Sequence, residues 1–359
     1  MAFFKEGKVA EIIENTPTLI RVTVDVDDAR RDAAGFPEML GPIEVGDRVV
    51  VNMTGIDLDL GTGGVAFVLW NLDGPGPQPG RTGHIVKLRY TPWQMNVMAA
   101  EAPESEHHAA LESAESIDSM PVVACGLHSQ VAAVVAGIKA KRPDSVIGYL
   151  MTDAAALPLA WSRLIRQLTD AHLLEVTATA GHAFGGDLET VNVFSGLAVL
   201  RHVGRTDVTV VAPGPGVVGT DTPLGFSAIE QGQVLDAATA LGGRAVACLR
   251  ISFSDERERH RGISHHALTA LKIGARETCT VVVPELPQEQ ASYVADQLRA
   301  SGVWDRHEGV VVRGDEAIEL LEDRGISPTS MGRSLRQVPE LFVAAGAAGI
   351  HAAALLEDS

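Results

Sequence analysis

The sequence is poor in cysteine and in aromatic side chains. It has 3 cysteines among 359 residues, and 4% of its residues are aromatic. Cys125, Cys248 and Cys279 are far apart, and each lies in or at the end of an apolar run, so they exclude a disulfide scaffold and a CxxC zinc or redox motif. They predict reduced core thiols in a reducing compartment, and we expect a cytoplasmic protein.

Positive charge and long apolar runs are also scarce. The 29 Lys and Arg residues oppose 46 Asp and Glu residues, which gives a net charge of −17. Such a surface repels nucleic acid and anionic lipid, because binding to their phosphates depends on Lys and Arg. No run reaches the roughly 18 apolar residues of a membrane span, and the N-terminal residues lack the apolar stretch of a signal peptide. We therefore expect neither a nucleic-acid partner nor a membrane partner.

The length predicts two domains. Residues 1–97 contain short apolar runs with period-two alternation between Gly and Pro turns, which predicts a small antiparallel β barrel or sandwich. Its candidate strands lie at 7–14, 18–26, 47–58, 64–72 and 83–90. An acidic, alanine-rich connector is expected over residues 98–120.

Residues 121–359 alternate short apolar runs with helical periods, which predicts a doubly wound, mostly parallel α/β domain of six or seven strands. A closed eight-stranded barrel is disfavoured because no eighth strand is evident. The last predicted helix, within 338–356, is apolar and rich in small residues. It either packs inside this domain or pairs with a copy of itself, and we expect a homodimer.

Polar residues gather in the loops that follow the predicted parallel strands, whereas the opposite connections are short. Because ligands bind beyond the carboxyl ends of parallel strands, this asymmetry predicts a ligand site at that edge of the sheet. The residues expected to act as acid or base there are His128, Asp153, His182 and His265.

A glycine-rich loop over 213–226 contains the pattern GxGxxG after a predicted strand, which is typical of an anion-binding turn. Pro215 lacks an N–H, the next helix is delayed, and the following strand ends at Arg250, where NAD-binding proteins carry an acid. These departures disfavour a dinucleotide, and a purely structural turn stays an alternative. The expected ligand-binding residues are Gly214, Gly216, Gly219, Thr220, Arg250 and Arg261.

The candidate metal ligands are His182 and Asp187, although no HExxH spacing supports them. The alternative is that they brace a glycine-rich loop, with Asp187 near a helix start. A second polar loop, 252–266, is either a solvated surface loop or a mobile lid. A lid would bring Arg259, Arg261 or His265 to an anionic substrate. Ser264 is expected to cap the helix after it.

Seven short motifs are spread over nearly the whole chain. They are GTGG at 61–64, CGLHSQ at 125–130, MTD at 151–153, AGHAFGGDLE at 180–189, GPGVVGTDTPLGFS at 214–227, HRGISHH at 260–266 and MGR at 331–333. Together they resemble a bacterial family of unknown function. The resemblance implies a bacterial cytoplasmic protein with a β domain followed by an α/β domain, and it implies no activity, cofactor or catalytic residue.

The sequence favours an enzyme that acts on a small anionic metabolite, with a phosphorylated metabolite as the narrower case. Two alternatives stay open. One is a non-catalytic metabolite-sensing or assembly protein, and the other is a metal-dependent hydrolase. The reaction and the cofactor are not specified by the sequence.

Overall fold

A computed structural model describes residues 3–60, 64–77 and 82–358, and it divides the chain between Val97 and Met98 into two compact units. The predicted fold class, a small barrel followed by a parallel α/β domain, is confirmed. No helix of the described ranges is long and apolar enough to cross a bilayer. All three cysteines are buried and free. The GTG at 61–63 lies outside the described residues.

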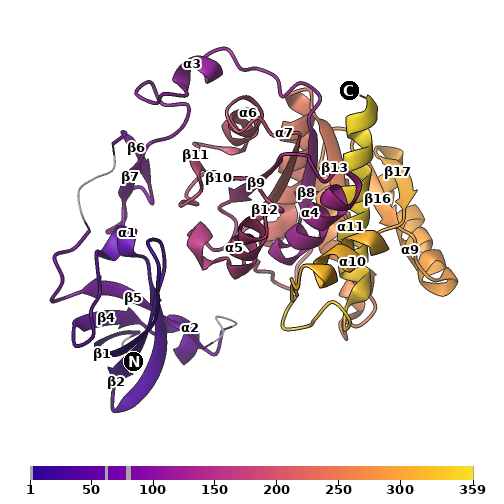
Figure 1. Cartoon of the computed structure of the whole chain (residues 1–359). Coiled ribbons are helices and arrows are strands. Elements are labelled where there is room, and N and C mark those ends of the chain that lie inside the picture. Colours follow the sequence, from indigo (N-terminus) through magenta and orange to yellow (C-terminus); the bar gives the residue numbers. More distant parts are fainter. Residues whose placement is uncertain (1–2, 61–63, 78–81, 359) are drawn as a thin grey trace. The chain divides into compact units, whose positions relative to one another are not determined.

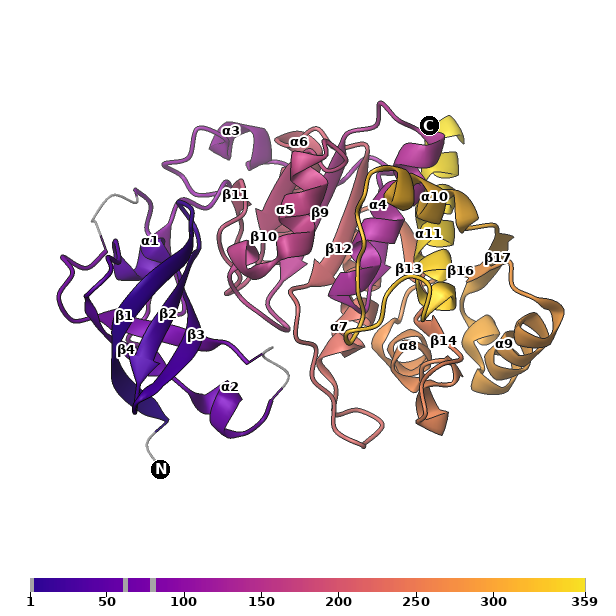
Figure 2. The same cartoon turned by 60° about the horizontal axis from the view of Figure 1, so that its bottom comes forward.

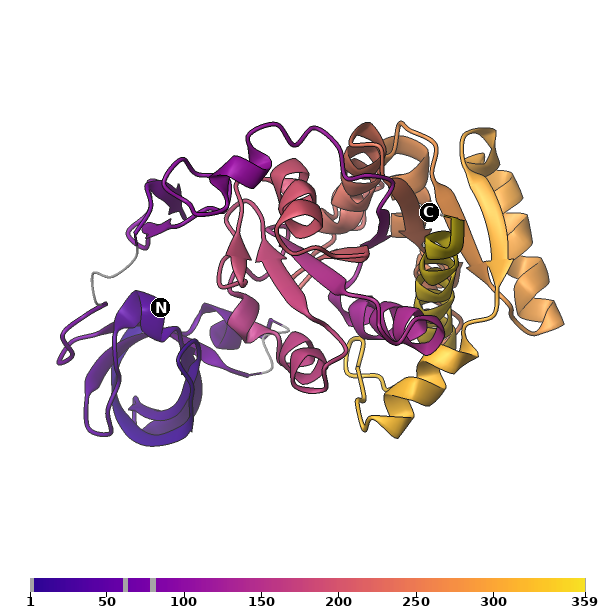
Figure 3. The same ribbon diagram turned by 45° about the horizontal axis from the view of Figure 1, so that its top comes forward.

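The first unit is a closed five-stranded barrel with the order β1-β2-β3-β5-β4, seen end-on in Figure 3. Alternate residues of β2, such as Val22 and Val24, are buried and fill its core. All pairs are antiparallel except β3 with β5, which gives the barrel the topology of an OB fold. The strands are β1 (Phe4–Asn15), β2 (Ile20–Val26), β3 (Ala29–Gly35), β4 (Arg48–Asn52) and β5 (Ala66–Asn71).

Three details of this unit differ from the sequence prediction. The polar segment ARRDAAG forms β3, which the apolar pattern misses because few of its side chains face the core. The segment predicted as a strand beyond residue 52 turns into α2 (Thr54–Asp57), and α1 (Pro37–Leu40) lies between β3 and β4. The last predicted strand is reduced to β6 (Ile85–Lys87), which pairs with β7 (Met95–Val97) in a separate hairpin.

The second unit contains an eight-stranded parallel sheet with the order β11-β10-β9-β12-β8-β13-β16-β17, one strand more than predicted. The additional strand is β11, which has only two residues and therefore no apolar run in the sequence. Thr179 Oγ1 of β10 donates to the carboxylate of its Glu189 at 2.6 Å. The sheet is open. Its strands are β8 (Pro121–Cys125), β9 (Ile147–Thr152), β10 (Val176–Thr179), β11 (Leu188–Glu189), β12 (Val208–Pro213), β13 (Arg244–Cys248), β16 (Thr280–Pro284) and β17 (Glu308–Val312).

Helices cover both faces of this sheet (Figures 1 and 2). One face carries α4 (Val131–Lys141), α5 (Arg163–Asp170), α10 (Asp315–Asp323) and α11 (Pro339–Ala354). The other carries α6 (Val193–His202), α7 (Glu230–Ala240), α8 (His265–Thr269) and α9 (Gln288–Ser301). The short α3 (His108–Leu111) precedes the sheet, and β14 (Ile251–Ser252) pairs with β15 (Gly262–Ile263) in the 252–266 loop.

The final helix α11 packs inside this unit. A Cβ at Gly137 of α4 or at Gly349 of α11 would collide with backbone of the other helix, so small residues allow the two helices to lie in close contact. The apolar surface of α11 is therefore used within one chain and supplies no separate reason for a dimer.

The sheet has a topological switch point between two neighbouring strands. The chain leaves β8 for α4 on one face, and it leaves β12 for α7 on the other face. Because the two connections diverge, the carboxyl ends of β8 and β12 border a crevice, which is where ligands bind in open α/β sheets.

Candidate functional site

At the switch point, His128 connects the ends of three elements. Its Nδ1 donates to the Pro213 carbonyl at 3.1 Å, and its Nε2 accepts from Ser162 Oγ at 2.7 Å. Burial lowers the pKa of His128 to about 4, so the ring is neutral near pH 7. Ser162 also caps α5 by accepting from the Ile165 N–H at 3.0 Å. Both ring nitrogens are thus engaged in holding β8, β12 and α5 together.

Glu230, the first residue of α7, lies beside the same crevice. Its carboxyl group accepts a short hydrogen bond from Thr152 Oγ1 at the end of β9. Burial, with a smaller contribution from the nearby Asp153, raises the pKa of Glu230 to about 7 despite the opposing hydrogen bond from Thr152. A carboxyl group at a helix N-terminus normally favours its charged form, and here desolvation outweighs that effect.

Buried glutamines fill the adjoining strand ends. Gln231 Nε2 donates to the carbonyls of Ala124 and Cys248 at 2.8 and 2.9 Å, and Gln130 Nε2 donates to Leu249 at 2.9 Å. Glutamine side chains therefore already donate hydrogen bonds to the backbone carbonyls at this part of the sheet edge. A ligand site is better sought where buried polar atoms still lack partners.

Such atoms occur in a group of three histidines, His260, His265 and His266, which we call the histidine cluster. One nitrogen from each ring lies within 4.8 Å of the other two. The ring centroids are 4.3 to 5.0 Å apart. His265 Nε2 and His266 Nδ1 are buried and have no hydrogen-bond partner. Three converging imidazole nitrogens are a ligand set for zinc and related divalent metals.

Local structure explains why these rings converge. The β14–β15 pair folds the 252–266 loop back on itself, and the Ser264 N–H donates to the Arg250 carbonyl at 2.9 Å. Ser264 Oγ accepts from the His266 N–H at 3.3 Å and caps α8 as expected. The same hydroxyl lies 2.7 Å from His260 Nδ1. It thereby orients one ring, as outer-shell partners of metal ligands do.

The electrostatics of the histidine cluster favour neutral rings. Burial, followed by the charge of Arg250, lowers the pKa of His260 to about 4. Burial and the neighbouring His265 lower the pKa of His266 to about 3. Neutral imidazole is the form that binds metal ions. The positive charge of Arg250 also makes the surroundings of the histidine cluster attractive to an anion.

The glycine-rich loop 213–226 borders the histidine cluster. Phe226 stacks on His266 with ring centroids 4.1 Å apart. A Cβ at Gly219 would lie 3.1 Å from His266 Cε1, so glycine permits the loop to contact that ring. Arg259 of the 252–266 loop forms a 2.6 Å ion pair with Asp221 and joins the two loops. The elements involved, α7, α8 and β14, are labelled in Figure 2.

The loop does not present the row of free amides that its GxGxxG pattern suggests. The Thr220 N–H donates to the Gly225 carbonyl at 2.6 Å, and the Val218 N–H donates to Ser227 Oγ at 3.2 Å. Gly214 lies against the Ala156 carbonyl, whereas Gly216, with φ of 101°, has open space on its Cβ side. Two amides of the expected anion cradle are therefore used within the loop itself.

The expected metal ligands His182 and Asp187 belong to no group of three potential ligands among the described residues. Asp187 Oδ2 accepts from the Thr177 N–H and Oγ1 at 2.9 and 2.8 Å, and so braces the loop against β10. The His182 N–H donates to Asp153 Oδ2 at 2.9 Å, which joins the loops after β9 and β10.

The two arginines expected to bind an anion, Arg250 and Arg261, lie in different environments. The side chain of Arg250 is 15% exposed, its Nη2 lies 3.9 Å from Asp255 Oδ2, and burial lowers its pKa. Arg261 donates to the Phe253 carbonyl at 3.3 Å and lies over the Phe253 ring at 5.7 Å. Arg250 is the one whose charge acts on the histidine cluster.

Sequence reasoning found His265 but missed His260, His266 and Glu230. The signal for the two histidines was the segment HRGISHH, which places imidazoles five and six positions apart. The turn at Ser264, between the first histidine and the other two, brings the rings together. Glu230 has no signal in the sequence because its raised pKa arises from tertiary burial.

A comparison with protein families agrees with the resemblance noted in the sequence. A family model described as "Protein of unknown function (DUF3866)" matches residues 32–349. The expected likeness to an uncharacterised family is thereby confirmed. No curated protein matches the chain.

Proposed function

We propose that this chain, which belongs to the DUF3866 family of proteins of unknown function, binds a divalent transition metal at the histidine cluster and hydrolyses a small anionic substrate there. The observation that carries the proposal is the convergence of three imidazoles, two of which, His265 and His266, each have a buried nitrogen without a hydrogen-bond partner. It unites the anionic substrate and the metal-dependent hydrolase that the sequence offered as separate hypotheses.

The ligand chemistry supports zinc. Catalytic zinc sites commonly have three protein ligands and one open position, where a bound water is activated for hydrolysis. Zinc–nitrogen distances are about 2.0–2.1 Å, so three nitrogens that lie up to 4.8 Å from one another must move closer together to bind one ion. Ser264 holds the ring of His260, and we expect the rings of His265 and His266 to rotate toward the ion.

The charge around the histidine cluster supports an anionic substrate. Burial is the main cause of the lowered pKa of His265 and His266, and the positive charges of Arg250 and Arg259 lower it as well. Guanidinium groups bind carboxylate and phosphate through paired N–H donors. A cytoplasmic setting, without nucleic acid or membrane, also belongs to the proposal, and light scattering tests the expected homodimer.

Metal binding is tested first, independently of turnover. Protein treated with a chelator is titrated with Co²⁺, whose visible absorption reports tetrahedral coordination. We expect one equivalent to bind, and His265→Ala and His266→Ala to abolish the signal. His172→Ala, at an exposed site, is the matched control. Binding that survives in both cluster variants but is lost in His182→Ala would transfer the metal to the site expected from sequence.

Turnover is tested with p-nitrophenyl phosphate as an anionic probe and p-nitrophenyl acetate as a neutral one. We expect Zn²⁺ to restore hydrolysis of the phosphate to the chelator-treated protein. Arg250→Gln should raise KM for the phosphate more than for the acetate. Metal binding without hydrolysis of either ester would favour the alternative of a metabolite-sensing or assembly protein.

A further inference from the structure

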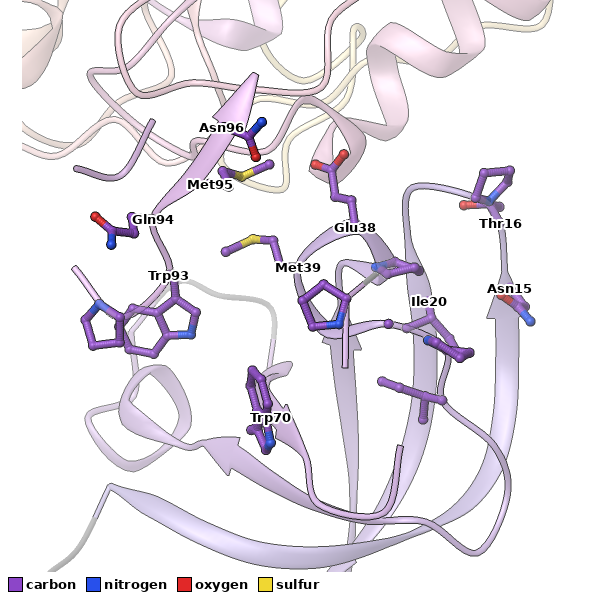
Figure 4. A pocket seen from close by; sticks show the side chains of 17 residues that line it. Asn15, Thr16, Ile20, Glu38, Met39, Trp70, Trp93, Gln94, Met95 and Asn96 are labelled. Carbon is purple, nitrogen blue, oxygen red and sulfur yellow. The ribbon is translucent and has the colours of Figure 1, made fainter. Parts of the chain in front are cut away.

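The first unit contains a large hollow, distant in the sequence from the histidine cluster. Its volume is about 970 Å³, and all its lining residues belong to the unit ending at Val97. Figure 4 shows side chains from the β1–β2 turn, α1, β5 and the β6–β7 hairpin around one space, with Trp70, Trp93 and Met39 among them. This volume lies at the upper end of the range for small-molecule sites.

The part of the wall next to Trp70, formed by Gly41 and Pro42, is preorganised by close backbone contacts. Gly41 has φ of 77°, and a Cβ there would collide with the Gly76 carbonyl oxygen, so the two glycines hold the loop after β5 against the end of α1. The buried Asn71 donates to the Pro42 carbonyl at 3.0 Å and to Asp47 Oδ2 at 2.8 Å. A wall that is fixed before binding lowers the entropic cost of binding.

Aromatic rings dominate the apolar part of the lining. Trp70 is 46% exposed, although a side chain of this size is normally largely buried. Trp70 and Trp93 border the same hollow with Met39 and Met95. Exposed tryptophans offer flat apolar faces, on which the C–H faces of a sugar ring can stack, and an indole N–H that donates a hydrogen bond.

The polar part of the lining carries amides rather than cations. Asn15 and Gln94 each offer both a donor and an acceptor, and Thr16 offers a hydroxyl. Among the lining residues that the structure describes, there is no Lys, Arg or His, and Glu38 is the single acid. A nucleic acid or a phosphorylated ligand requires cationic partners, so this chemistry favours an uncharged ligand with many hydroxyl groups.

From these observations we infer that the barrel unit binds a neutral oligosaccharide in this hollow, with Trp70 and Trp93 stacking on sugar rings and the amides bonding to hydroxyls. The volume suits a chain of about two or three sugar units better than a monosaccharide. OB folds bind oligosaccharides as well as oligonucleotides. The absence of Lys, Arg and His among the described lining residues favours the oligosaccharide. The inference does not depend on the metal proposed for the second unit.

The test uses the full chain on a printed array of neutral glycans, followed by fluorescence titration with the strongest glycan. We expect Trp70→Ala and Trp93→Ala each to weaken binding at least about tenfold, and Gln94→Ala to weaken it less. Trp304→Phe, outside the barrel unit, is the matched control and should bind as the parent does. Thermal unfolding shows which variants are folded, and Trp93→Phe replaces any alanine variant that is not.

Three results would overturn the inference. One is that no neutral glycan on the array is retained. Another is that a glycan is retained with an affinity that neither tryptophan substitution changes. The third is that a deoxythymidine decamer or a proline-rich peptide competes with the glycans and binds through the same tryptophans more tightly than any of them.

Discussion

Replacing Glu230 by Gln should make the second unit more stable at alkaline pH and leave it nearly unchanged at acidic pH. Burial raises the pKa of this carboxyl group from 4.5 to about 7. Between these values the unfolded chain releases a proton that the folded chain keeps, so stability falls as the pH rises through this window. At 1.36 kcal/mol per pKa unit the full shift corresponds to about 3 kcal/mol, and residual solvation of the group reduces it to roughly 2 kcal/mol.

Urea denaturation between pH 4.5 and pH 8 measures this effect. Trp161 and Trp304 belong to the second unit, so a background with Trp70→Phe and Trp93→Phe makes fluorescence report that unit. The amide of Gln keeps an acceptor for Thr152 Oγ1. We expect the stability difference between Glu230→Gln and its parent to grow from near zero to about 2 kcal/mol as the pH rises, whereas Glu308→Gln, at an exposed site, shows no comparable trend. A constant difference, or one that grows toward acid, would refute the reasoning.

Two further predictions concern residues around the edge of the sheet. Ser162→Ala removes the cap of α5 and the partner of His128 Nε2 together, so it should lower the free energy of unfolding by about 1–3 kcal/mol in the same denaturation assay, and an unchanged midpoint would contradict the described contacts. Gly219→Val places methyl groups against His266, so it should weaken Co²⁺ binding in the absorption titration while the far-ultraviolet circular dichroism stays that of the parent, and full-strength binding would contradict the contact.

The fold follows from the sequence where burial is continuous along a segment. Strands such as β8 and β12 are buried on both faces, so their apolar runs are unmistakable. β3 carries charged residues on its outer side and contributes only its last three residues to the buried interior. Its place in the barrel depends on pairing with β2 and β5, which no local pattern records.

The candidate site was predictable as an edge of the sheet but not as a set of residues. The polar loops after the strands indicate the carboxyl edge, because parallel topology brings those loops together. The choice of His182 and Asp187 as metal ligands used their expected place at a strand end or in a first helical turn, whereas the structure shows Asp187 hydrogen-bonded to Thr177. The histidine cluster depends on the fold of a loop around Ser264, which propensity and periodicity do not encode.

The most direct test of the account is the Co²⁺ absorption titration of the chelator-treated protein beside its His265→Ala, His266→Ala double variant. The histidine cluster predicts one equivalent of tetrahedral Co²⁺ in the parent, displacement of that Co²⁺ by Zn²⁺, and no tetrahedral signal in the double variant. Absence of a signal from the folded parent, or an equal signal from the double variant, would contradict a metal centre built by His260, His265 and His266.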